Sequence, residues 1–307
     1  MISRKDVEAA WDRIRPHVRR TPVLKLRAGW LGMTTPLAVK LEQLQVSGSF
    51  KGRGAFHKLV STEVPATGVI AASGGNHGAA VAYAARALGH KAEIFVPTTS
   101  SAAKVARLQS YGAIVHQVGE VYVQAREASE KRAAETGALK VHAYEDSVVF
   151  AGAGSVALEF AEQAKFDTLL VAVGGGGLIA GCATAIGAST KIVAVETEGT
   201  ATLFEARKAG KPVEVKISGI AADALGASLI GTPNFEIAKK LVKDALLVTD
   251  QAVRNAQHML WEELRLIAEP SGATSLAALL SGVYEPAANE RVGILICGAN
   301  TDPATAV

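Results

Sequence analysis

Four short segments of the sequence combine small residues with side chains that can do chemistry. In the first, residues 47–55, Lys51 lies among serines and glycines directly before an apolar helical pattern. The positive end of a helix dipole and partial burial both lower the pKa of a lysine, which frees its amine to act as a nucleophile and base. Lys51 is therefore a candidate catalytic residue, although a surface lysine in a glycine-rich turn would give the same local pattern.

The second segment is the turn Ser73-Gly74-Gly75-Asn76-His77, which follows a strand-like run at residues 69–72 and precedes a helical pattern at 79–88. Small residues at a strand-to-helix turn leave backbone N–H groups free to bind an anion, and the helix dipole assists. The turn is thus a candidate site for a carboxylate or a phosphate. The alternative is a tight turn in which Asn76 and His77 only cap the helix.

The third segment is the run Gly174-Gly175-Gly176-Gly177, between an apolar strand-like run at 168–173 and a helix that begins near Leu178. Glycine costs about 1 kcal/mol relative to alanine in regular structure, so four in succession favour a close backbone approach to a ligand such as a phosphate. A merely flexible loop is the alternative. The run lacks the spacing of a Walker lysine loop or of a dinucleotide fingerprint, so nucleotide binding is not favoured.

The fourth segment, Cys297-Gly298-Ala299-Asn300, follows the last strand-like run at residues 292–296. Open parallel sheets bind ligands at the carboxyl ends of their strands, and this segment would lie at such an end. Taken alone, Cys297 would more simply be a buried core cysteine.

The elements that must position these segments alternate between strands rich in valine and isoleucine and longer helical patterns. Such alternation predicts an α/β fold with mainly parallel sheets and right-handed crossovers. We expect two lobes: a small substrate-gating domain at residues 65–146, and a large cofactor-binding domain at 1–64 and 147–307. The large domain would be discontinuous because the extended segments at 22–26 and 37–41 are expected to pair with its sheet. The predicted strands are 69–72, 91–96, 113–118 and 139–143 in the small domain, and 168–173, 191–195, 245–248 and 292–296 in the large one.

Composition excludes several classes of protein. The chain has 307 residues, 49% hydrophobic and 20% charged, with a net charge of +3, which is typical of a globular enzyme and gives no basis for nucleic-acid binding. With only Cys182 and Cys297, neither a disulfide framework nor a paired-cysteine zinc site is expected. The sequence shows no signal peptide and no apolar run of membrane-spanning length, so we expect no membrane partner and a cytoplasmic location.

Together the four segments resemble the fold-type II pyridoxal-phosphate-dependent enzymes, specifically the threonine and serine dehydratase family that includes serine racemase. The resemblance extends from Arg20-Thr21-Pro22 to Glu269-Pro270-Ser271 and so spans nearly the whole chain. It implies a homodimer that converts a small L-hydroxy amino acid, such as threonine or serine, to a 2-oxo acid and ammonia by α,β-elimination.

The resemblance also implies a role for each segment. Lys51 would form an imine with the aldehyde of pyridoxal 5′-phosphate, with Phe50 packed near the cofactor ring and Asn76 hydrogen-bonded to its 3′-oxygen. The run Gly174-Gly175-Gly176-Gly177 would hold the phosphate, and Cys297 would face the pyridine nitrogen. The turn Ser73-Gly74-Gly75-Asn76-His77 would bind the substrate carboxylate. A neutral thiol at the ring nitrogen favours elimination over transamination, and Lys51 would then take the proton from Cα.

The sequence departs from the family pattern at three places. Racemising members carry a second serine where this chain has Gly74, so we expect a dehydratase rather than a racemase. Many members carry glutamine where this chain has Ala153, which leaves threonine, serine, 3-hydroxyaspartate and aryl-serines open as substrates. Glu196 matches one ligand of the divalent cation that some members bind, but Thr202 replaces the second acidic ligand, so a metal is not expected.

Three other functions remain compatible with the same motifs. One is amino-acid racemisation, and another is β-replacement, as in cysteine synthases of the same fold. The third is a catalytically silent protein that binds pyridoxal phosphate, since an intact lysine and phosphate loop do not by themselves require turnover.

Overall fold

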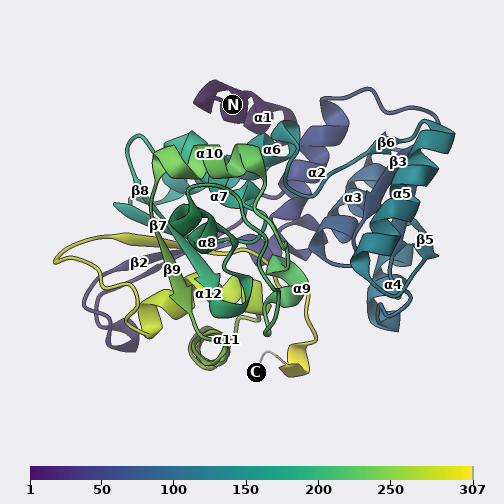
Figure 1. Cartoon of the computed structure of the whole chain (residues 1–307). Coiled ribbons are helices and arrows are strands. Elements are labelled where there is room, and N and C mark those ends of the chain that lie inside the picture. Colours follow the sequence, from purple (N-terminus) through teal and green to yellow (C-terminus); the bar gives the residue numbers. More distant parts are fainter. Residues whose placement is uncertain (306–307) are drawn as a thin grey trace.

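Two β-sheets organise the chain, and each is flanked by helices (Figure 1). The computed structural model describes residues 1–305. One sheet has six strands in the order β1-β2-β10-β7-β8-β9, and the other has four in the order β5-β4-β3-β6. The predicted α/β fold with mainly parallel sheets is therefore confirmed. The strands are β1 Val23–Leu26, β2 Leu37–Leu41, β3 Val69–Ala72, β4 Ala92–Val96, β5 Ile114–Gln117, β6 Leu139–Lys140, β7 Thr168–Ala172, β8 Lys191–Thr197, β9 Val242–Val248 and β10 Val292–Ile296.

Helices connect the strands and cover the faces of both sheets. None of those in the described part of the chain is long and apolar enough to cross a membrane. The α-helices are α1 Arg4–Ile14, α2 Lys51–Val60, α3 Asn76–Ala87, α4 Ala102–Ser110, α5 Tyr122–Thr136, α6 Ser147–Gln163, α7 Gly177–Ile186, α8 Thr202–Ala209, α9 Ala222–Leu225, α10 Thr232–Leu241, α11 Asp250–Leu264 and α12 Pro270–Leu280.

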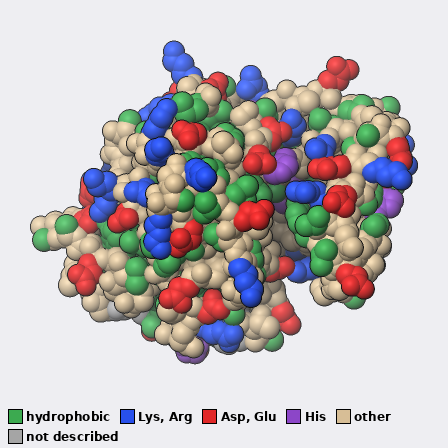
Figure 2. Space-filling view, in the orientation of Figure 1, with side chains coloured by type: hydrophobic (Ala, Val, Ile, Leu, Met, Phe, Trp, Pro, Cys, Tyr) green, Lys and Arg blue, Asp and Glu red, His purple; other side chains and the backbone are tan. Residues whose placement is uncertain are grey.

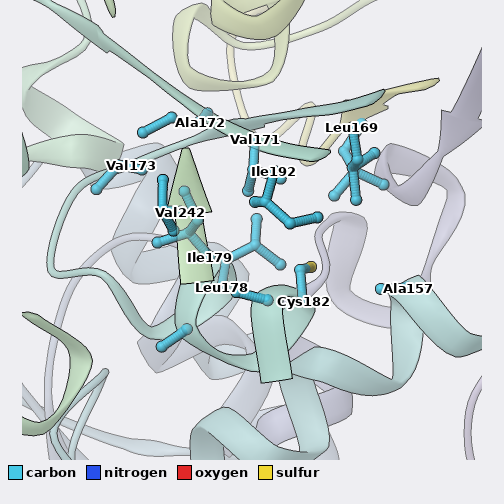
Figure 3. Close-up of a cluster of buried hydrophobic side chains, with 14 of the residues drawn as sticks. Ala157, Leu169, Val171, Ala172, Val173, Leu178, Ile179, Cys182, Ile192 and Val242 are labelled. Atoms are coloured by element: carbon cyan, nitrogen blue, oxygen red, sulfur yellow. The ribbon is translucent and has the colours of Figure 1, made fainter. Parts of the chain in front are cut away.

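The six-stranded sheet forms the centre of the large lobe. Its strands β2, β10, β7, β8 and β9 pair in parallel, and β1 adds to the edge antiparallel to β2. Helices α1, α6, α7 and α10 lie on one side of it, and α11 and α12 on the other (Figure 1). Because both faces are covered, β2, β7 and β10 are buried along their whole length. Figure 3 shows Leu169 and Val171 of β7 directed toward Ile179 and Cys182 of α7.

The four-stranded sheet forms the small lobe, with α3, α4 and α5 packed against it. Its strands come from residues 69–140, and the strands of the large sheet lie before and after them in the sequence. The domain boundaries at residues 64 and 146 stay a prediction. The predicted strand at 139–143 is wrong in length, because only Leu139–Lys140 pairs with β3. The chain turns after Val141, where Nδ1 of His142 accepts hydrogen bonds from the backbone N–H groups of Tyr144 and Glu145.

A buried group of four charged side chains connects the elements around Lys51. Both Nε and Nη2 of Arg53, in the first turn of α2, donate to the carboxylate of Glu42 at 2.8 Å. Nη2 also donates to Glu159 of α6 at 2.9 Å, and Lys40 of β2 pairs with the same carboxylate. All four side chains are 0% exposed. Two cations and two carboxylates balance, so the group ties β2, α2 and α6 together without a net buried charge.

The Arg53→Met variant should test the contribution of this group to stability. Removing the guanidinium leaves Glu42 and Glu159 buried with one cation between them, which we expect to cost about 3–5 kcal/mol of unfolding free energy. Urea unfolding followed by circular dichroism would measure the loss. The matched control is Arg4→Met, which breaks the exposed Arg4–Glu8 pair and should cost less than about 1 kcal/mol. Equal unfolding midpoints for the two variants would contradict this account.

Candidate active site

The segment that precedes Lys51 is held by the segment that follows β10. The N–H of Phe50 donates to the carbonyl oxygen of Cys297 at 3.0 Å, and the N–H of Ala299 donates to that of Gly48 at 3.0 Å. Helix α2 then begins at Lys51 itself. The first and fourth predicted segments, far apart in the sequence, are therefore neighbours through backbone hydrogen bonds.

The Lys51 amine lies in surroundings that favour its neutral form. Nζ donates a hydrogen bond to the carbonyl oxygen of Ala143 at 3.0 Å and lies 5.2 Å from the centre of the Phe50 ring. Burial lowers the pKa of Lys51 to about 8, although Cys297 and Glu269 act in the opposite direction. An amine with this pKa is available as a nucleophile and base near neutral pH.

A cavity between the sheets brings the predicted cofactor residues together. Both lobes contribute to it, and a groove between the lobes is visible in Figure 2. Of the residues predicted for the cofactor site, every one lines this cavity. They are Phe50, Lys51, Asn76, Gly174, Gly175, Gly176, Gly177 and Cys297.

The glycine run supplies unpaired donors to this cavity. Within residues 1–305, the N–H groups of Gly174, Gly175 and Gly176 have no hydrogen-bond acceptor, and α7 begins immediately afterwards at Gly177. Unpaired N–H groups at a helix N-terminus bind anions such as phosphate. Together with the Lys51 amine, the cavity fits a molecule that carries both an aldehyde and a phosphate.

Cys297 is a neutral thiol at the wall of the cavity. Its side chain is buried, and Sγ lies 3.4 Å from the carbonyl oxygen of Ser271, to which it donates. Burial, with a contribution from Glu269, raises the pKa of Cys297 to about 12. The thiol therefore stays protonated at neutral pH and presents no carboxylate-like charge to a bound ring.

The predicted substrate turn follows β3, and α3 begins within it at Asn76. The Asn76 side chain donates to Oε1 of Glu269 at 2.5 Å and accepts a hydrogen bond from Asn300 at 2.5 Å. The His77 ring points elsewhere, with Nε2 at 3.0 Å from the carbonyl oxygen of Val141. Burial, assisted by Lys51, lowers the pKa of His77 to about 3, so the ring is neutral. Any contact of His77 with a carboxylate would come from its backbone N–H.

The glycines of this turn leave space beside it. Ser73 accepts a hydrogen bond from the N–H of Gly75 at 3.3 Å, which shapes the turn locally. A Cβ atom at Gly74 would meet its nearest neighbours, Oγ of Ser100 and Cγ1 of Val96, at 3.5 Å, an ordinary van der Waals contact. Ala153 lines a small apolar hollow on the side of Lys51 toward α6.

The sequence motifs do not identify two residues of the site, Glu269 and Tyr144. Glu269 is buried and accepts hydrogen bonds from Asn76, from the hydroxyl of Ser271 at 2.6 Å and from the N–H of Asn300 at 3.1 Å. Burial raises the pKa of Glu269, and these hydrogen bonds act in the opposite direction by stabilising the charged carboxylate. A helix start directly after it, marked by Pro270, was the available signal.

Tyr144 is the second such residue. Its ring lines the cavity and covers the glycine run so closely that a Cβ at Gly175 would lie 2.3 Å from its Cγ. Glycine is therefore required at position 175. The signal for Tyr144 was its position after the last strand of the small sheet, at the edge where parallel sheets bind ligands.

Glu196, the candidate metal ligand, serves the N-terminus of α8 in this structure. Its two carboxylate oxygens accept hydrogen bonds from the N–H groups of Leu203 at 2.8 Å and Phe204 at 2.7 Å. Burial raises the pKa of Glu196 to about 7. Across the described residues, no group of three or more histidine, cysteine or acidic side chains is placed to hold a metal ion.

Comparison with known proteins agrees with this geometry. The family model described as "Pyridoxal-phosphate dependent enzyme" matches residues 14–298. The catabolic L-threonine dehydratase TdcB of Staphylococcus aureus is 35% identical over 98% of this chain and 90% of its own length. Maize serine racemase has a similar structure, with a TM-score of 0.93, 34% identity, and coverage of 99% of this chain and 95% of its own. A threonine deaminase from T.th. gives a TM-score of 0.90, 34% identity, and coverage of 98% and 99%.

The family match covers nearly the whole chain, and the cavity offers the amine and the anion-binding N–H groups that its cofactor, pyridoxal phosphate, requires. The chain therefore belongs to the pyridoxal-phosphate-dependent enzymes, within the family that includes threonine dehydratases and serine racemases.

Proposed function

We propose that this enzyme is a dehydratase that releases water and ammonia from a small L-hydroxy amino acid such as threonine or serine, with Lys51 as the catalytic residue. The observation that carries the proposal is the Lys51 amine, which shares one cavity with the glycine run and the Cys297 thiol. The resemblance to a threonine dehydratase and a threonine deaminase over nearly the whole chain supports this reaction class. The cytoplasmic location and the homodimer stay predictions from the sequence.

Pyridoxal phosphate, when bound, supplies an aldehyde that captures the substrate amine and a ring that accepts electrons from Cα. Residues of the protein would bind the cofactor and the substrate and transfer the proton. Lys51 anchors the aldehyde and, as a neutral amine, takes the proton from Cα. The N–H groups of Gly174, Gly175 and Gly176 bind the phosphate. The turn at residues 73–77 binds the substrate carboxylate through its backbone, since the His77 ring is occupied by Val141.

Two features favour elimination over the alternatives. Cys297 stays neutral, so it would not stabilise a protonated ring nitrogen as a carboxylate would, and the bound cofactor would be a weaker electron sink, which favours loss of a leaving group from Cβ. Gly74 has no side chain that could return a proton to the opposite side of Cα. Racemisation should therefore be minor, even though one of the similar structures is a serine racemase.

The decisive test is the Lys51→Ala variant. The purified wild-type enzyme should show the visible absorbance of a lysine-bound aldehyde, which borohydride removes, and should release 2-oxo acid from threonine or serine. Lys51→Ala should lose both the absorbance band and the 2-oxo acid. A wild-type protein that takes up no pyridoxal phosphate would refute the proposal. A coloured wild type that releases no 2-oxo acid from any hydroxy amino acid would leave only cofactor binding.

The reactivity of Lys51 should follow its lowered pKa. A neutral amine reacts with acylating reagents, so in cofactor-free protein the labelling rate of Lys51 should rise with pH through a midpoint near the pKa of about 8 and then level off. An ordinary exposed lysine, with a pKa of about 10.4, should continue to rise well beyond that pH. Timed labelling followed by peptide mass spectrometry resolves the two. A Lys51 rate that is still rising at pH 10 would show that the amine is not desolvated.

The Gly74→Ser variant tests the preference for elimination. The added Cβ meets nothing closer than 3.5 Å, so the substitution should be tolerated. The new hydroxyl would lie beside the substrate turn, where it could return a proton to Cα. We expect chiral chromatography of unreacted L-serine to show more D-serine with the variant than with the wild type. Substantial D-serine from the wild type itself would overturn the assignment as a dehydratase.

A further inference from the structure

The glycine run can bind a phosphate only if its N–H groups face the cavity, and two side chains outside the cavity donate hydrogen bonds to carbonyl oxygens of the run. Oγ1 of Thr202, at the start of α8, lies 2.6 Å from the carbonyl oxygen of Gly174. Nδ2 of Asn234, in the first turn of α10, lies 2.8 Å from the carbonyl oxygen of Gly175, which also accepts a hydrogen bond from the backbone N–H of Gly231 at 3.2 Å. Both side chains are fully buried, and neither is among the residues that line the cavity in the described part of the chain.

Peptide geometry converts these contacts into an orientation of the donors. In a planar trans peptide, the C=O of one residue and the N–H of the next point in opposite directions. The bond from Thr202 to the Gly174 carbonyl therefore directs the N–H of Gly175 away from α8. The bond from Asn234 to the Gly175 carbonyl directs the N–H of Gly176 away from α10. Both of these N–H groups lack an acceptor within residues 1–305.

Thr202 and Asn234, which we call the two anchors, are themselves held in place. Nδ2 of Asn234 also donates to the carbonyl oxygen of Tyr144 at 2.8 Å, so both of its amide protons are used. The one hydroxyl proton of Thr202 goes to the Gly174 carbonyl, and the backbone of Thr202 is held at the start of α8, where Glu196 accepts hydrogen bonds from the N–H groups of Leu203 and Phe204. Glycine has the widest backbone freedom of any residue, so a run of four needs such external restraints to keep one conformation.

We infer that Thr202 and Asn234 are positioning residues for the phosphate of pyridoxal phosphate: they hold two carbonyls of the glycine run outward so that the following N–H groups face the cavity. This inference rests on the proposed role of the run. It assigns to each anchor an effect on the affinity for the phosphate group. The anchors should have little effect on the aldehyde site at Lys51.

The test compares pyridoxal phosphate with pyridoxal, which has the same aldehyde and no phosphate. Full-length cofactor-free protein is titrated with each compound, and the dissociation constants are read from the visible absorbance of the lysine-bound aldehyde. Thr202→Val removes the hydroxyl, and Asn234→Leu removes the amide at similar volume. Each should raise the dissociation constant of pyridoxal phosphate about fivefold, the usual effect of one hydrogen bond. The constant for pyridoxal should change by less than about twofold.

Two control variants match the chemistry. Thr202→Ser keeps the hydroxyl and should retain the wild-type affinity for pyridoxal phosphate. Thr184→Val makes the same change as Thr202→Val at a buried hydroxyl that has no hydrogen-bond partner among the described residues, so its affinity should also be unchanged.

The outcomes separate this inference from the proposed function. If Thr202→Val and Asn234→Leu match Thr184→Val, or if they weaken pyridoxal as much as pyridoxal phosphate, the anchoring role is wrong while Lys51 can still carry the cofactor. A variant that is generally destabilised would weaken the binding of pyridoxal and of pyridoxal phosphate alike, and this result would also count against the anchoring role. A wild-type protein that binds neither compound at Lys51 would instead refute the proposed function.

Discussion

The bidentate contact between Arg53 and Glu42 is the constraint on which the rest of the site depends. Arg53 lies two residues after Lys51 in the first turn of α2, and its guanidinium is fixed at 2.8 Å from both carboxylate oxygens of Glu42. A planar guanidinium held at two points allows little rotation, and burial from water strengthens the contact. The start of α2, and with it the origin of the Lys51 side chain, is thereby fixed relative to β2 and α6.

Around this fixed point the site combines groups whose charged forms are disfavoured by burial with donors that lack a partner. Burial lowers the pKa of Lys51 and His77 and raises that of Cys297, so the ring and the thiol are uncharged at neutral pH and the Lys51 amine loses its proton more readily than an ordinary lysine. Within the described residues, the glycine run adds N–H groups without acceptors. These N–H groups, at the N-terminus of α7, bind an anion by hydrogen bonds and a helix dipole. That suits a cofactor whose phosphate stays bound while the chemistry occurs at the opposite end of the molecule.

The sequence was sufficient to predict the α/β fold and the four segments of the site, because each segment is local: a strand, a short run of small residues and a helix start. Their meeting in one cavity followed from the rule that parallel sheets bind ligands at the carboxyl ends of their strands. Tyr144, Thr202, Asn234 and Glu269 were given no role because their contributions depend on distant contacts. Asn234, for example, holds a carbonyl 59 positions earlier in the chain, and nothing in its own neighbourhood indicates this.

The position of β10 has a consequence for how the enzyme is made. This strand is the last in the described sequence, yet it lies between β2 and β7 in the middle of the large sheet. During synthesis, β2 and β7 therefore each keep an unpaired apolar edge until residues 292–296 have emerged, and such edges favour aggregation. The same late segment supplies the Cys297 backbone that holds Phe50 beside Lys51. A chain that stops short of residue 292 would therefore lack both the strand that covers these two edges and the backbone contact that positions Phe50.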